Sequence, residues 1–140
     1  MPSRPVQVSR QFNASPESVY DTWLKPEWVK RWLFKSDSNE ITTVEINPRP
    51  GGHFSILELN NGEEIDHFGN YREPERPHRL VFTLEVPKHF PGQTLVTVII
   101  KPVAGGSVLN FTQTGVSPEI TESNWKIMPD RLNEALGNKG

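Results

Sequence analysis

The strongest constraint on the fold is the period-two alternation of apolar and polar side chains between residues 40 and 116. Alternation of this kind predicts β-strands with one buried face, and turn residues separate the alternating stretches. The Asn-Asn-Gly sequence at 60–62 favours a tight hairpin turn, and Ala-Gly-Gly at 104–106 marks another turn. The region therefore predicts about five or six antiparallel strands that follow one another as a meander.

Before this region, the sequence predicts one further strand and two short helices. Residues 5–13 alternate in the manner of a half-buried strand. Ser15 and Pro16 suit the N-cap and the first position of a helix, and Pro26 ends that helix and begins another. Each helix is too short to be stable alone, so both depend on packing against the rest of the protein.

After this region, the sequence predicts a single amphipathic helix whose N-cap is Ser117. Its apolar residues recur at intervals of three or four: Trp125, Met128, Leu132 and Leu136. Pro129 lies inside the pattern and removes a backbone hydrogen bond, which predicts a bent or divided helix. The order of elements predicts an α+β fold, in which a curved antiparallel sheet of about six or seven strands wraps around this helix. No domain boundary is visible, so residues 1–140 are expected to form a single domain.

Composition argues against several classes of function. The 15 lysines and arginines are balanced by 17 acidic residues, and no basic cluster of the kind that binds nucleic acid is present. There are no cysteines, which excludes disulfides and thiolate chemistry. No apolar run suits a membrane span or a signal peptide, so a cytoplasmic location is expected.

Chemistry-bearing residues form no recognisable catalytic pattern. The four histidines lack metal-ligand spacing: His53, His67, His78 and His89. The densest carboxylates flank the 60–62 turn, where we expect them to be solvated: Glu58, Glu63, Glu64 and Asp66. No nucleophile motif or phosphate-binding loop is present either. The sequence therefore predicts no catalytic residue, no metal and no cofactor.

The chain also resembles a known family along nearly its whole length. SRQFNASPESVYDTWLKPEWVKRWL, RPGGHFSI, GNYREPERPHRLVFTLE and LVTVIIKPVAGGSVLNFTQTGV are similar to motifs of START-like (SRPBCC, helix-grip, birch-pollen-allergen-like) proteins. The closing NWKIMPDRLNEAL is similar to that family's last helix. The resemblance is to the branch named for the activator of heat-shock-protein-90 ATPase, and it implies the helix-grip fold.

Three positions depart from the family's pattern. The family often has a second tryptophan after Trp32, where this chain has Leu33. It often has a histidine in the last strand, where Gln113 stands here, and an amide cannot transfer a proton in its place. Pro129 replaces an apolar residue of the closing helix.

The resemblance implies a space between sheet and helix, which is the candidate site. The predicted sheet faces are mostly apolar with a few polar groups, as is typical of small-molecule pockets. The candidate ligand-binding residues are Arg10, Trp23, Trp32, Phe54, Ile56, Tyr71, Phe82, Leu84, Val98, Phe111, Gln113, Trp125 and Met128. Two alternatives stay open: the tryptophans either fasten the short helices or face a ligand, and Arg10 and Gln113 point either inward or to the edge and solvent.

Three functions are consistent with these observations. The first is non-enzymatic binding of a small hydrophobic or amphipathic ligand, lipids included, which requires a cavity of several hundred Å³. The second is a co-chaperone-like or stress-response role with a chaperone or other protein partner, as a monomer or homodimer. The third is an enzyme of the polyketide-cyclase kind, whose acid–base candidates are Arg10, His67 and Tyr71, none with an assignable orienting partner.

Overall fold

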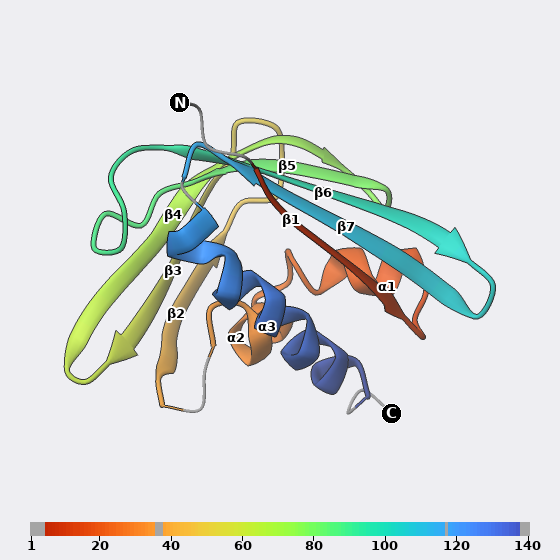
Figure 1. Cartoon of the computed structure of the whole chain (residues 1–140), viewed down its shortest axis with the longest axis horizontal. Helices are drawn as coiled ribbons and strands as arrows, with labels where there is room; N and C mark the ends of the chain where they lie inside the picture. Colours follow the sequence, from red (N-terminus) through yellow and green to blue (C-terminus); the bar gives the residue numbers. More distant parts are fainter. Residues whose placement is uncertain (1–4, 36–37, 117, 138–140) are drawn as a thin grey trace.

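The computed structural model describes residues 5–35, 38–116 and 118–137. A first strand and two short helices precede a run of six strands, and a long helix closes the chain (Figure 1). The elements are β1 Val6–Phe12, α1 Pro16–Asp21, α2 Pro26–Trp32, β2 Glu40–Ile46, β3 His53–Asn60, β4 Glu63–Glu75, β5 Arg79–Leu84, β6 Thr94–Val103, β7 Gly106–Thr114 and α3 Pro118–Gly137. The predicted cap Ser117 lies outside the described residues.

The strands form one seven-stranded antiparallel sheet in the order β1-β7-β6-β5-β4-β3-β2. Strands β2 to β7 pair with their neighbours in sequence, whereas β1 joins the far edge beside β7. The sheet curves around α3, and the short helices lie on the same side of the sheet as α3 (Figure 1). The predicted helix-grip α+β fold is therefore confirmed.

The turn between β3 and β4 sets the register of that hairpin. Asn61 and Gly62 have φ values of 54° and 80°, which is the left-handed backbone of a two-residue type I′ turn. Asn60 consequently pairs with Glu63. Further from the turn, Ile56 pairs with His67, so side chains of even-numbered β3 residues share a face with His67.

The short helices begin as their sequence predicts. The hydroxyl Oγ of Ser15 accepts a hydrogen bond from the backbone N–H of Ser18 at 3.2 Å, and Pro16 follows as the first helical residue. Pro26 begins α2. The long helix α3 continues through Pro129 as one element, so the alternative of a divided helix is wrong.

Candidate ligand-binding cavity

A cavity of about 330 Å³ lies between the sheet and residues 121–131 of α3. Its walls come from the segment after α2, the ends of β3, β5 and β7, the start of β4, the β5–β6 connection and α3. The lining residues are Phe34, Lys35, Asn39, Glu58, Asn60, His67, Leu84, Val86, His89, Phe90, Gln113, Thr121, Trp125, Ile127, Met128 and Arg131. The gap between sheet and helix is therefore open at this end of the fold.

The structure separates the predicted ligand-binding residues other than Arg10 into three groups. Those that line the cavity are Leu84, Gln113, Trp125 and Met128. A second void of about 10 Å³, which has room for about one water molecule, is bordered by Trp23, Trp32 and Phe111, and Trp125 and Met128 border it as well. The remaining apolar candidates are buried in the core without lining the cavity: Phe54, Ile56, Tyr71, Phe82 and Val98.

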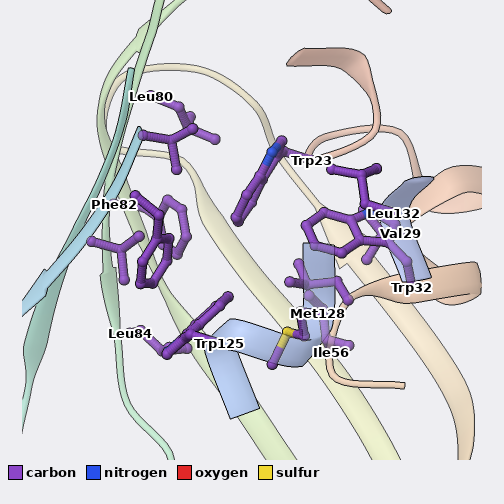
Figure 2. Close-up of a cluster of buried hydrophobic side chains, with 14 of the residues drawn as sticks. Trp23, Val29, Trp32, Ile56, Leu80, Phe82, Leu84, Trp125, Met128 and Leu132 are labelled. Atoms are coloured by element: carbon purple, nitrogen blue, oxygen red, sulfur yellow. The ribbon is translucent and has the colours of Figure 1, made fainter. Parts of the chain in front are cut away.

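Trp23 and Trp32 are packing residues. The rings of Trp23 and Trp32 meet edge to face, with centroids 4.7 Å apart. The indole N–H of Trp32 donates to the backbone oxygen of Thr22 at 2.9 Å, which ties α2 to the end of α1. Trp23 points into the cluster toward Phe82 and Trp125 (Figure 2). Both side chains thus fasten the short helices to the core.

Arg10 does not face the cavity. It lies on the edge strand β1, and its guanidinium Nη1 donates to the carboxylate of Asp130 on α3. The two side chains are 34% and 61% exposed, so this ion pair is at the surface. The edge alternative from the sequence is the one observed for Arg10.

Gln113 points inward and joins the sheet to α3. Its side chain is fully buried. The amide oxygen accepts hydrogen bonds from the indole N–H of Trp125 at 2.9 Å and from the hydroxyl of Thr121 at 3.1 Å. The amide nitrogen donates to the hydroxyl of Thr94 at 3.1 Å. The residue at the family's histidine position is therefore a hydrogen-bonding anchor for the helix wall of the cavity.

Buried polar side chains of the β3–β4 hairpin also line the cavity. Nε2 of His67 and Oε1 of Glu58 are 2.9 Å apart, and the amide Nδ2 of Asn39 donates to Oε2 of Glu58 at 2.6 Å. Glu58 and His67 are only 6% and 3% exposed. Because Ile56 pairs with His67 and Glu58 follows two residues later on the same face, the hairpin register itself brings the two groups together.

Burial and hydrogen bonding set the protonation of this pair. Burial lowers the pKa of His67 below its ordinary value, and the hydrogen bond and charge of Glu58 offset this only in part. For Glu58, burial opposes ionisation, but the hydrogen bonds from His67 and Asn39 prevail and hold its pKa below the ordinary value. At neutral pH the pair is therefore a neutral imidazole beside a carboxylate.

The expectation that Glu58 is solvated is wrong. Glu58 continues the inward phase of Phe54 and Ile56, and the sheet and the segment after α2 cover it. His67 consequently has the orienting partner that could not be assigned from the sequence. The alternation of β3 and the predicted turn together contained the signal for this pair, since they determine which residues of the hairpin lie side by side.

Phe34, which the sequence analysis did not select, covers the histidine. Its ring stacks on the imidazole of His67 with centroids 3.9 Å apart and planes at 13°. Its backbone has φ 61°, a left-handed conformation that is uncommon for a bulky residue. Several lining residues lie in connections between regular elements, among them Phe34, Val86, His89 and Phe90. Sequence periodicity does not predict whether side chains in such connections point inward or outward.

Within residues 5–35, 38–116 and 118–137, no group of three or more acidic or histidine side chains is placed to hold a metal ion. None of the helices in those ranges has the length and apolar character needed to cross a membrane.

Several solved structures share this architecture. A protein from Chromobacterium violaceum is 24% identical, with a TM-score of 0.84 over 93% of this chain and 94% of the other. A protein from Rhodobacter sphaeroides is 22% identical, with a TM-score of 0.86 over 100% of this chain and 98% of the other. An AHSA1-like protein from Aeromonas hydrophila is 18% identical, with a TM-score of 0.84 over 96% and 93%. These likenesses establish the fold.

Sequence comparison gives one distant relative and a family. A protein named formate–tetrahydrofolate ligase, from Arthrobacter sp. (strain FB24), is 24% identical over 113 residues, which are 75% of this chain. The chain spans only 20% of that protein's length. The family described as activator of Hsp90 ATPase homolog 1-like protein matches residues 13–137. Together with the helix-grip fold, this match shows that the chain belongs to the activator of Hsp90 ATPase homolog 1-like family, within the START-like proteins.

Proposed function

We propose that this protein binds a small, largely apolar ligand in the cavity between the sheet and α3, without transforming it. The single observation that carries the proposal is the cavity of about 330 Å³, which lies at the small end of the range of roughly 300–1,000 Å³ typical of ligand pockets. The cavity is open to solvent on one side, where its lining residue Ile127 is 54% exposed, so a ligand can enter it without opening the core.

The volume of the cavity limits the size of the ligand. At about 330 Å³ the cavity is near the lower limit for ligand pockets, which favours a small molecule over a large one. The surface of the walls is more apolar than polar, with Phe34, Phe90 and Trp125 contributing, although nine of the sixteen described lining residues are polar or charged. A one- or two-ring aromatic molecule or a short amphipathic chain fits this description better than a full-length lipid.

The test is to measure binding of toluene and of naphthalene by calorimetry and by the shift in thermal unfolding. At a free concentration 100 times Kd, one bound ligand stabilises by about 2.7 kcal/mol, which for this size of chain raises Tm by roughly 8 °C. Val86→Phe places a larger side chain in the cavity wall and is expected to weaken binding at least tenfold. The matched control Val103→Phe changes a valine that is 39% exposed and should leave binding unchanged. Absence of binding by the wild-type protein would contradict the proposal.

The family match supports a second candidate function, co-chaperone-like binding to a protein partner. Under this hypothesis the chain stimulates the ATPase activity of an Hsp90 chaperone, and cavity variants such as Val86→Phe leave that stimulation intact. A steady-state ATPase assay with the purified chaperone tests this. If adding this protein does not change the ATPase rate of the chaperone, the hypothesis is wrong. The cytoplasmic location and a role in a stress response stay predictions.

A further inference from the structure

The wall of the cavity is more positively charged than the protein around it. Among the described lining residues, with histidine counted as neutral, two are cations and one is an anion: Lys35, Arg131 and Glu58. The chain as a whole has a formal charge of −2. A cleft with an excess of one charge attracts ligands of the opposite charge, so the cavity favours an anionic ligand.

The single anion already has hydrogen-bond partners within the protein. Oε1 of Glu58 lies 2.9 Å from Nε2 of His67, and Oε2 accepts a hydrogen bond from Nδ2 of Asn39 at 2.6 Å. The residue is also buried. A cationic group on a ligand therefore finds this carboxylate covered and engaged.

Lys35 brings its charged group to the wall. Nζ donates to the backbone oxygen of Asn39 at 2.7 Å, which places the ammonium group beside another residue that lines the cavity. Lys35 is half-buried, so part of it is accessible. An ammonium group has three donors and can serve more than one acceptor at the same time.

Arg131 lies on the open side of the cavity. It follows Ile127 by four residues on α3, and residues with this spacing lie on the same face of a helix. Both residues line the cavity, and Ile127 is 54% exposed where the cavity opens. Arg131 is half-buried, and its planar guanidinium matches the geometry of a carboxylate.

We propose that the cavity selects small amphipathic molecules with one carboxylate group, which Lys35 and Arg131 bind while the apolar part of the ligand lies against the aromatic and aliphatic walls. Aromatic acids and short-chain fatty acids belong to this class. The inference rests on the proposed binding function and names its ligand class. A carboxylate bound by half-buried cations stays close to solvent, so its binding carries little of the desolvation cost that a fully buried ion pair has.

Three probes of nearly equal shape differ in charge: hydrocinnamate, its neutral amide and protonated phenylpropylamine. Calorimetry at neutral pH and low salt is expected to show hydrocinnamate binding about tenfold more tightly than the amide, because its contacts with the cations are charge-assisted. The amine should bind most weakly. Added salt should reduce the preference for hydrocinnamate and leave the affinity for the amide unchanged.

Variants of the two cations test the assignment. Lys35→Gln and Arg131→Gln should each weaken hydrocinnamate binding about threefold, since two cations share a tenfold preference, and the double variant should bind hydrocinnamate and the amide equally. Retained binding of the amide shows that each variant is folded with its cavity intact. The matched control Lys101→Gln removes an exposed lysine of β6 outside the cavity and should keep the tenfold preference.

The outcomes separate this inference from the proposed function. Equal binding of hydrocinnamate and its amide by the wild-type protein, tighter binding of the amine, or an unchanged preference in the double variant would overturn the inference alone. Failure of all three probes, and of toluene and naphthalene, to bind would overturn the proposed function as well.

Discussion

Replacement of Gln113 by leucine tests whether hydrogen bonds hold α3 against the sheet. Leucine is apolar and one bond shorter, and it cannot serve the indole N–H of Trp125 or the hydroxyls of Thr121 and Thr94. Thr94 keeps a bond to the backbone oxygen of Leu84 at 2.7 Å, so the indole N–H is the main group left unpaired.

The magnitude follows from these contacts. A stranded indole N–H costs about 2 kcal/mol, and the two lost bonds to threonine hydroxyls about 1 kcal/mol each. The greater apolar burial of leucine offsets about 1 to 2 kcal/mol. We expect Gln113→Leu to lower the free energy of unfolding by about 2 to 3 kcal/mol, measured as a shift of the urea midpoint at constant m.

A double-mutant cycle makes the test specific. Trp125→Phe removes the indole N–H, so in that background Gln113→Leu should cost about 1 to 2 kcal/mol less. The control Gln93→Leu changes an exposed glutamine and should stay within about 0.5 kcal/mol of the wild type. A cost below about 0.5 kcal/mol for Gln113→Leu, or no coupling to Trp125, would refute this account of the anchor.

Three further predictions concern the buried pair, the tryptophans and the sheet. The pKa values of His67 and Glu58 both lie below their ordinary values in the folded protein. The contribution of each group to stability is therefore complete above the pKa that the group has in the unfolded chain, and it is lost as the pH falls. Unfolding at a series of pH values should therefore show stability decline from about pH 6.5 downward, and the upper part of the decline should be absent in Glu58→Gln/His67→Phe. Trp32→Ala should cost about 3–5 kcal/mol in urea unfolding. Trp28→Ala, at a partly buried ring, should cost clearly less, and similar costs would contradict the packing role of Trp32. Gly69→Ala should cost at least about 3 kcal/mol, since the new Cβ would lie 1.9 Å from a backbone oxygen of β5, and a near-neutral result would show that the strands can separate there.

The order of elements could be predicted because each depends on local sequence. Three local signals each act over a few residues: the alternation from residue 40, the two prolines that begin the short helices, and the Asn-Gly turn. The strands, helices and turn lie where these signals predict them. The sequence also predicted that Pro129 could divide α3, but α3 is one continuous helix. Packing along its length stabilises it in spite of the one hydrogen bond that Pro129 cannot make.

The cavity could be predicted only in part, because its place depends on where α3 crosses the sheet. Alternation correctly gave the inward faces, but it could not tell which inward residues α3 covers, so Phe54 and Phe82 lie in the filled part and Leu84 in the open part. Glu58 was missed for a different reason. Its charge and its closeness to the turn suggested solvent, although its strand phase pointed inward.

The pairing of β1 with β7 has a consequence for how the protein is made. Val6 lies beside Gln113, a separation on the order of a hundred residues, whereas the other neighbours in the sheet adjoin in sequence. During translation the opening strand leaves the ribosome long before the strand that receives it, so it docks late, after the meander has assembled. Until then the unpaired edge of β7 can pair with the same segment of another nascent chain. Domain swapping of the N-terminal strand is therefore the expected form of misassembly when several copies are synthesised close together.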